Sequence, residues 1–343
     1  MKKIAFCCDG TWSHPKSKDT VSTTDTNVYK LYKALPTTAT QSPRYDDGVG
    51  ADTSLIEHFL GGAFGEGLFA KIKEGYTKIA HDYQDGDAIY LFGFSRGAYT
   101  ARSIGGMLAA CGLPMNLTDA AISDAFDTYR KKSGSPERAA AKADLVAKYG
   151  NRPVTIQMIG VWDTVGSLGI PSLIGGVDPL RYGFLDTGLS GQVKSAYQAI
   201  AIDERRLSFP PTLWDGDPAP GQVVEQVWFT GCHSSVGGGC PDSGLSDITL
   251  KWMLGKCKDQ GLEIDPGIWA RYEALDTTVH ALDVIDESWS PFWGLPRQRQ
   301  VPSDSTIASS VAARLQHLMS YLPTNLLLTA ERMLAKTYRS LTV

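Results

Sequence analysis

The feature of this sequence that most constrains its fold is the pentapeptide Gly-Phe-Ser-Arg-Gly at residues 93–97. It lies between an apolar, strand-like segment at 88–92 and a segment at 97–110 with the apolar spacing of a helix. In this context the pattern G-x-S-x-G is typical of a nucleophile elbow, a turn so tight that it needs small residues on both sides of the serine. The motif therefore predicts that Ser95 is a nucleophile at the N-terminus of a helix, where the helix dipole favours a developing negative charge.

Around this motif, short apolar runs alternate with helical stretches, which is typical of a mostly parallel sheet covered by helices. We expect strands at residues 3–8, 44–49, 88–92, 154–162, 196–202 and 223–229. We expect helices at residues 66–80, 97–110, 244–256 and 311–340. The predicted fold class is α/β, with an α/β-hydrolase-like sheet flanked by helices.

The length of 343 residues is enough for one large domain, so we expect a single α/β-hydrolase domain over residues 1–343. A polar, alanine-rich helical insertion is predicted at 117–149. Residues 166–194 mix glycines with apolar side chains and fit no regular element, which indicates a lid-like segment suited to an acyl chain. Residues 300–343 are expected to form C-terminal helices. An apolar stripe there, between 311 and 322, favours a helix that covers the sheet, with membrane-surface contact as the alternative.

A nucleophilic serine needs a general base and an acid that orients the base. In this fold the three residues follow one another as serine, acid and histidine. His233 suits the position of the base, because it comes after Ser95 and after the predicted strand at 223–229. The glycine-rich loop that carries it can bend the imidazole over the edge of the sheet.

Two aspartates are candidates for the acid, and the sequence leaves both open. Asp163 ends one predicted strand between apolar residues, and Asp203 ends the next with Arg205 and Arg206 beside it. Counting strands favours Asp203, because the acid usually follows the second strand after the elbow. Local chemistry favours Asp163, since an aspartate beside two arginines is typical of a surface ion-pair cluster. We prefer Asp163 and keep Asp203 as the alternative acid.

The oxyanion hole of such an enzyme needs two convergent backbone donors. The N–H of Arg96, which directly follows the nucleophile, is expected to be one of them. The second donor is expected from the loop after an earlier strand. Gly10 and Thr11 lie in that place, just after the predicted strand at 3–8.

Composition and spacing argue against several other functions. The formal net charge is −4, with 33 basic and 37 acidic residues and no basic tract, so we expect no binding to nucleic acid. The glycine-rich segment 61–67 lacks the Gly-Lys-Ser/Thr ending of a phosphate-binding loop. The cysteines around His233 have no spacing common in zinc sites, so neither a metal nor a cofactor is expected.

The sequence also bears on location. The apolar run at 4–8 is too short for the core of a signal peptide, and no stretch reaches the roughly 20 apolar residues of a membrane span. None of the six cysteines forms a C-x-x-C pair. We therefore expect a cytoplasmic protein with reduced thiols and without a signal peptide.

Six motifs carry a family resemblance. In chain order they read FCCDGTW, YDDGVG, GFSRGAYTAR, GVWDTVGSLG, AIDERRLSF and VWFTGCHSSVGGG. As a set, over roughly residues 3–250, they resemble an uncharacterised α/β-hydrolase-like family that includes the lipase effectors of type VI secretion. The resemblance implies a triad with Ser95 as nucleophile, His233 as base, and Asp163 or Asp203 as acid. The sequence departs from the family at Ser235, where the family usually has an aspartate.

For its secreted members the family resemblance implies phospholipase A1 or A2 activity, export by a type VI secretion system, and a secretion or immunity protein as partner. We predict a serine hydrolase that cleaves carboxylic esters through an acyl-enzyme, with phospholipid as the preferred substrate. One alternative is an esterase or thioesterase that acts on a non-lipid substrate. The other is a non-catalytic interaction protein on a hydrolase scaffold.

Overall fold

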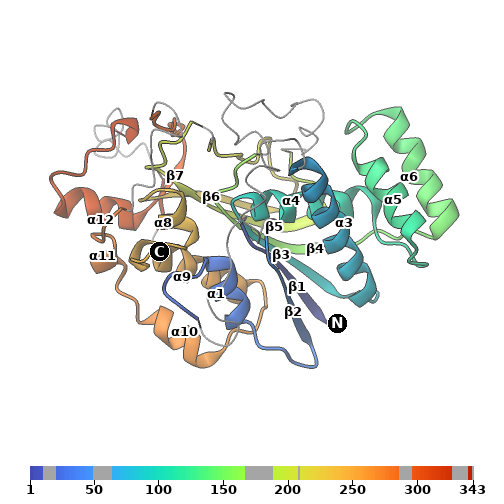
Figure 1. Cartoon of the computed structure of the whole chain (residues 1–343), viewed down its shortest axis with the longest axis horizontal. Helices are drawn as coiled ribbons and strands as arrows, with labels where there is room; N and C mark the ends of the chain where they lie inside the picture. The colour runs from blue at the N-terminus through green and yellow to red at the C-terminus, as the bar shows by residue number, and fades with distance from the viewer. Residues whose placement is uncertain are drawn as a thin grey trace.

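The computed structural model describes residues 1–10, 21–48, 64–166, 188–207, 209–285, 296–326 and 339–341. Within these residues the centre is an eight-stranded sheet in the order β2-β1-β3-β4-β5-β6-β7-β8, and every neighbouring pair is parallel (Figure 1). The strands are β1 (Lys3–Cys8), β2 (Gln41–Asp46), β3 (Ala88–Phe94), β4 (Ile156–Trp162), β5 (Val193–Ala201), β6 (Val223–Phe229), β7 (Thr306–Ala308) and β8 (Arg339–Leu341). This confirms the predicted α/β class and its mostly parallel sheet.

Helices cover both faces of this sheet, as Figure 1 shows. In the described residues they are α1 (Asn27–Ala34), α3 (Phe64–Asp82), α4 (Arg96–Cys111), α5 (Asp119–Tyr129), α6 (Pro136–Tyr149), α8 (His233–Gly237), α9 (Gly244–Asp259), α10 (Pro266–Glu273), α11 (Thr277–His280) and α12 (Ser309–His317). Along β1, Ala5 and Cys7 join the core under α1 and α9, whereas Ile4 and Phe6 join the core under α3 and α4. The alternation follows from the period of two along a strand, and burial of both faces explains why the central strands read as continuous apolar runs.

The predicted insertion at 117–149 forms two helices, α5 and α6, which pack against each other beside α4. Each helix begins at a side-chain cap: Thr118 accepts from the backbone of Ala121, and Ser135 accepts from that of Arg138. The break between the helices spans residues 130–135.

The expectation of helices throughout 300–343 is wrong in part. The helix predicted at 311–340 ends at His317 as α12, and the range also contains strands β7 and β8. Leu318, at the end of α12, has an extended backbone, and Pro323 would prevent a helix from running uninterrupted through the rest of the range. Strands of three residues are too short to produce an alternating pattern, so no pattern in the sequence predicts them.

Two further expectations need correction or fall outside the described residues. The predicted lid-like segment 166–194 lies largely outside them, at 167–187, and its last residues belong to β5, which begins at Val193. The segment that carries His233 was expected to be a loop, but it forms the short helix α8.

Candidate active site

Ser95 stands in the sharp turn between β3 and α4. Its backbone has a φ of 58°, a strained left-handed conformation, and its N–H donates to the carbonyl of Trp162 at 3.0 Å. A Cβ atom on Gly93 would lie 2.4 Å from the carbonyl oxygen of Gly97, and one on Gly97 would lie 2.2 Å from that of Cys8. The turn therefore has room only for glycine on either side, which is the geometry expected of a nucleophile elbow.

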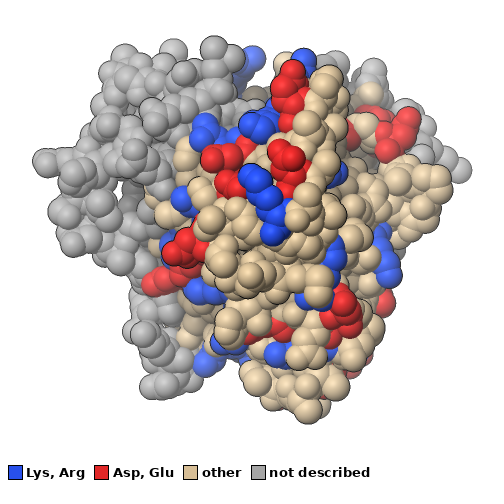
Figure 2. Space-filling model, turned by 90° about the vertical axis from the view of Figure 1, so that its right-hand side faces the viewer, with Lys and Arg blue, Asp and Glu red and all other residues tan. Residues whose placement is uncertain are grey.

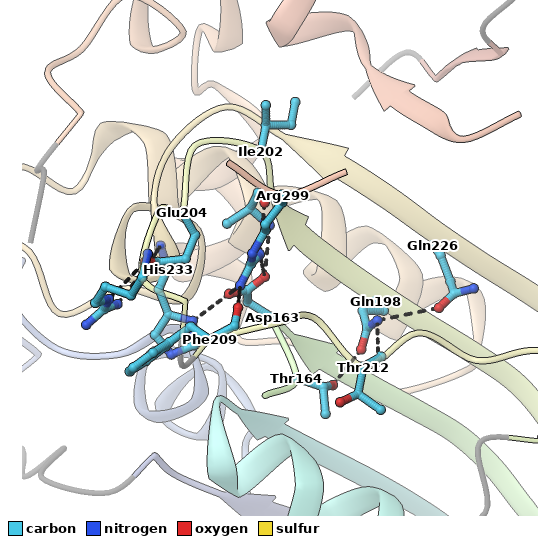
Figure 3. A network of polar contacts seen from close by, with 12 residues as sticks. Asp163, Thr164, Gln198, Ile202, Glu204, Phe209, Thr212, Gln226, His233 and Arg299 are labelled. Carbon is cyan, nitrogen blue, oxygen red and sulfur yellow. Dashed lines mark hydrogen bonds and ion pairs between the residues drawn. The ribbon is translucent and has the colours of Figure 1, made fainter. Parts of the chain in front are cut away.

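His233 begins α8, and the structure brings it to Asp163, which directly follows β4. The Nδ1 atom of His233 lies 2.5 Å from Oδ2 of Asp163, in a contact between two buried side chains (Figure 3). The imidazole packs against the ring of Phe94 with 4.6 Å between centroids, which places it beside the residue before Ser95. Its other nitrogen, Nε2, is buried and has no hydrogen-bond partner among the described residues.

The charge state of this histidine follows from its surroundings. Burial lowers the pKa of His233 below 6.5, although the hydrogen bond and charge of Asp163 act in the opposite direction. The imidazole is therefore neutral at neutral pH. If the proton is on Nδ1, facing Asp163, then Nε2 carries a free lone pair and can accept a proton.

Asp163 is completely buried and is held by donors on several sides. Arg299 contacts both of its oxygens, at 2.6 and 2.9 Å, and the backbone N–H of Ala201 donates to Oδ1 at 2.9 Å. Burial alone would raise the pKa of Asp163, but the charge of Arg299 and the hydrogen bond to His233 hold it well below its usual range. The carboxylate is thus ionised and fixed in direction, as an orienting acid must be.

Asp203, the alternative acid, makes different contacts. It accepts from the backbone N–H of Gly231 at 2.7 Å and from the hydroxyl of Tyr321 at 2.9 Å, and burial raises its pKa. The sequence predicts that Asp203 pairs with Arg205 and Arg206 at the surface. In the structure Arg206 instead pairs with Glu204 at 2.8 Å. Asp203 therefore fixes the loop that leads to α8, whereas the hydrogen bond of the His233 ring goes to Asp163.

Two residues of this network were not identified from the sequence. Arg299 lies 136 residues from its partner Asp163, and Glu204 accepts from the backbone N–H of His233 at 3.2 Å (Figure 3). Arg206 holds the same carboxylate and stacks on Phe209, whose ring meets the imidazole edge-on at 5.0 Å between centroids. Neither residue stands in a motif of catalytic type, so only the folded chain reveals them.

The loop expected to supply oxyanion donors lies against the elbow, because the carbonyls of Cys8 and Asp9 approach Gly97 closely. Gly10 donates its N–H to the carboxylate of its neighbour Asp9 at 2.7 Å, so this donor is engaged in the structure. Thr11 lies outside the described residues. Arg96, the residue after the serine, is the first residue of α4, one residue earlier than the helix predicted at 97–110.

Asp9 is a further buried acid beside the elbow. Besides Gly10, it binds the hydroxyl of Thr26 at 2.5 Å and that of Tyr45 at 2.7 Å. Burial raises its pKa to about 6, and the hydrogen bonds from Thr26 and Tyr45 oppose this shift. Asp9 therefore ties the end of β1 to two other segments of the chain and fixes the backbone beside Ser95.

The described residues contain no group of three His, Cys, Asp or Glu side chains that could hold a metal ion. Among the helices that the structure describes, none is long and apolar enough to cross a membrane.

A family model described as "T6SS, Phospholipase effector Tle1-like, catalytic domain" matches residues 2–256 of this chain. An uncharacterized protein of Saccharomyces cerevisiae is 27% identical over 230 residues, which are 61% of this chain and 32% of the yeast protein. The chain thus spans about a third of this relative's length.

Two solved structures are similar over part of their length. The crystal structure of an uncharacterized protein from Pseudomonas aeruginosa has a TM-score of 0.48 and 16% identity, and covers 81% of this chain and 49% of that one. The structure of the Tle1 effector bound to the VgrG spike from the type 6 secretion system has a TM-score of 0.36 and 17% identity, and covers 69% and 50%. This chain spans about half of either protein.

Proposed function

Because the chain belongs to the family of Tle1-like phospholipase effectors of type VI secretion, matched by their catalytic domain, we propose that it is a serine hydrolase that cleaves the acyl esters of phospholipids. The observation that carries this proposal is the pairing of His233 with the buried carboxylate of Asp163, next to the elbow that holds Ser95. We assign Ser95 as nucleophile, His233 as base and Asp163 as the orienting acid.

In the proposed reaction, Oγ of Ser95 attacks the ester carbonyl, while Nε2 of His233 takes the serine proton. The carboxylate of Asp163 holds the Nδ1–H tautomer and balances the charge of the imidazolium that forms. The tetrahedral intermediate then collapses, and His233 returns the proton to the leaving lysophospholipid oxygen. Water, activated by the same histidine, hydrolyses the acyl-enzyme and releases a fatty acid and free Ser95.

Backbone donors complete the proposed site. Arg96 is the first residue of α4 and directly follows the serine. In nucleophile elbows the N–H of the residue after the nucleophile is the first oxyanion donor, so we assign this role to Arg96. Thr11 or Gly10 would supply the second. The bond from the N–H of Gly10 to Asp9 favours Thr11 for this role, because a donor already engaged in the structure would have to turn away first.

The decisive test compares Ser95→Ala with Ser103→Ala. Ser103 is a fully buried serine of α4, the helix that follows Ser95. Its hydroxyl has no hydrogen-bond partner in the described part of the chain, so its loss should leave activity intact. We expect the Ser95 variant to lose nearly all hydrolysis of p-nitrophenyl butyrate and all labelling by a fluorophosphonate probe. Hydrolysis at the wild-type rate in Ser95→Ala would refute the assignment, and absence of labelling in folded wild type would favour a non-catalytic scaffold.

The substrate class is tested separately, by lipid mass spectrometry of phospholipid vesicles incubated with wild type and with Ser95→Ala. We expect lysophospholipid and fatty acid to appear in equal amounts with wild type alone. Unchanged lipids together with cleavage of soluble esters or thioesters would replace the phospholipid by a non-lipid substrate and keep the hydrolase.

Family membership also supports the proposal that a type VI secretion system exports the protein, with a secretion or immunity protein as its partner. The test is to follow tagged protein into the medium of a host that carries this gene. Equal amounts outside cells with a working and with a disabled secretion sheath would contradict export by this route.

A further inference from the structure

A cavity of about 500 Å³ lies between α4, the α5–α6 pair and the segment that leads into β5. Its wall includes Val193, which begins β5, and Ala110, near the end of α4. These residues lie toward the amino ends of the strands, whereas Ser95 and Asp163 follow the carboxyl ends of β3 and β4. The cavity is therefore separate from the proposed catalytic site, and none of the assigned triad lines it.

The charged side chains that line the cavity are all basic, namely Arg102, Arg138 and Lys142. On the outer surface of this side of the molecule, by contrast, Lys and Arg are interspersed with Asp and Glu (Figure 2). The excess of positive charge thus belongs to the cavity rather than to the whole face.

Arg138 is 9% exposed, and its guanidinium lies over the ring of Tyr129 at 5.6 Å from the centroid. Among the described residues, no carboxylate or carbonyl accepts a hydrogen bond from this guanidinium. Burying a cation without an acceptor is costly, so its donors are available to a ligand in the cavity.

Arg102 is also buried, at 4% exposed, and no carboxylate pairs with it in the described part of the chain. It stacks on Trp214 at 4.5 Å and donates to the carbonyls of Thr212 and Leu213 and to the side-chain oxygen of Gln198. Its Nε atom is buried and has no acceptor among the described residues. Burial lowers its pKa to about 10, and the charge of Asp215 opposes this shift only in part.

The backbone adds to the positive potential. Ser133, Gly134 and Ser135 line the cavity immediately before α6, a helix of 14 residues whose N-terminus therefore faces the same space. The helix dipole adds a partial positive charge there. The N–H of Arg138 is already bonded to Ser135, Pro136 has no N–H, and Glu137 places a carboxylate in the first turn, so the arginines carry most of the attraction for an anion. Together with two buried arginines, this is the electrostatic pattern of a site for a carboxylate or a phosphate.

Much of the remaining wall is apolar. Ile159, Leu189 and Trp214 line it, and apart from Arg102 the residues of α4 that line the cavity are glycines and alanines. A volume of about 500 Å³ is in the range of small-molecule sites. We propose that this cavity binds an amphiphilic anion, a single apolar chain that carries a phosphate or a carboxylate. The proposal does not depend on the proposed activity.

Isothermal titration calorimetry of the whole chain with octyl phosphate, octanoate, octanol and inorganic phosphate tests this proposal. We expect at least one of the two anionic amphiphiles to bind about tenfold or more tightly than octanol and inorganic phosphate, because charge-assisted hydrogen bonds and the apolar wall act together. The preference between octyl phosphate and octanoate identifies the head group. The proposal would be overturned if octanol or inorganic phosphate bound as tightly as the anionic amphiphiles. It would also be overturned if neither octyl phosphate nor octanoate bound.

Matched variants of α6 locate the site. Lys142→Gln removes an exposed charge of the cavity and Arg138→Gln a buried one, whereas Lys148→Gln removes an equal charge from the same helix outside the cavity. We expect the first two to weaken binding several-fold to tenfold and Lys148→Gln to leave it unchanged. Circular dichroism checks the fold of Arg138→Gln, and Lys142→Gln keeps the test valid if that variant unfolds. Equal affinities for the wild type and all three variants would refute the cavity as the site.

Discussion

At the scale of single residues, Asp163 and Asp203 are both held by several donors, but only Asp163 meets the imidazole. We expect Asp163→Asn to reduce turnover by about 10⁴, the loss known when the acid of a protease triad becomes an amide, because the histidine tautomer is then wrong. Asp203→Asn can still accept from Gly231 and Tyr321, so we expect less than about a tenfold loss and roughly 1 kcal/mol of stability. Turnover of p-nitrophenyl butyrate and urea unfolding measure both. A severe loss only in the Asp203 variant would assign the acid to the other strand.

The lowered pKa of His233 predicts the pH dependence of the proposed activity. The neutral imidazole is the active form, and activity falls as pH decreases through its pKa. Because burial lowers this pKa, we expect the acid limb of kcat/KM to lie below pH 6.5. A pH profile on a neutral ester measures it, and a midpoint at or above pH 7 would show that another group controls the reaction.

Sequence reasoning identified the proposed triad residues, which stand next to motifs, and missed residues that contact them from distant parts of the chain. Ser95 is fixed by local sterics, and His233 and Asp163 each follow a strand, so local patterns reveal them. Arg299 contacts Asp163, 136 residues away in the sequence, and Glu204 contacts His233, 29 residues away. No motif spacing predicts contacts of this kind. The choice between the two aspartates was open for the same reason.

At the scale of elements, the elbow depends on the close approach of α4 to the end of β1. A methyl group on Gly97 would collide with the backbone carbonyls of Cys8 and Asp9, which cannot move without displacing the strand. We expect Gly97→Ala to cost about 2–3 kcal/mol or more and to abolish the proposed activity. Gly255→Ala in α9 is the matched control, because nothing lies within 4 Å of its added carbon.

The control should raise stability by about 0.5–1 kcal/mol, since alanine restricts the unfolded chain and suits a helix interior. Urea unfolding of the two variants measures the difference. A Gly97→Ala protein as stable as wild type would mean that the turn has room that the structure does not show.

The elements predicted best are those with long, regular patterns. The strand at 3–8 and the long helix α3 were found close to their bounds because both faces of the strand are buried and the helix shows a clear apolar stripe. The C-terminal region was predicted less well. The apolar residues predicted there as one helix face do not share one face. Val311 packs into the core, whereas Met319 and Leu322 follow the end of α12 and are exposed.

At the scale of the whole molecule, the parallel sheet brings the residues of the proposed site to one edge. Strands β3 and β4 are neighbours, and β6 lies two places further along, so their carboxyl ends share one edge. The serine, the acid and the loop that leads to the histidine follow those three strands. Topology therefore brings together Ser95 and Asp163, which are 68 positions apart, and Asp163 and His233, which are 70 positions apart. The loops after the strands determine which aspartate reaches the histidine of the proposed site.

The proposed action on phospholipids requires contact with a lipid surface, and the molecule offers apolar side chains for it rather than charge. The net charge is −4, so anionic lipids should not attract the chain. Met319 is 92% exposed and Leu322 61%, near the end of α12. We expect binding to zwitterionic vesicles to equal or exceed binding to anionic ones, and to change little with added salt.

Met319→Asp should weaken vesicle binding about threefold to tenfold, because it replaces an apolar side chain that can insert between lipids by a charge. Met115→Asp is the control: Met115 is 73% exposed near the start of α5, away from α12, so the same change of charge should have little effect there. Co-sedimentation with vesicles at two salt concentrations measures both. Equal losses in the two variants would indicate that charge alone weakens binding, and no loss in Met319→Asp would place the lipid contact on another surface.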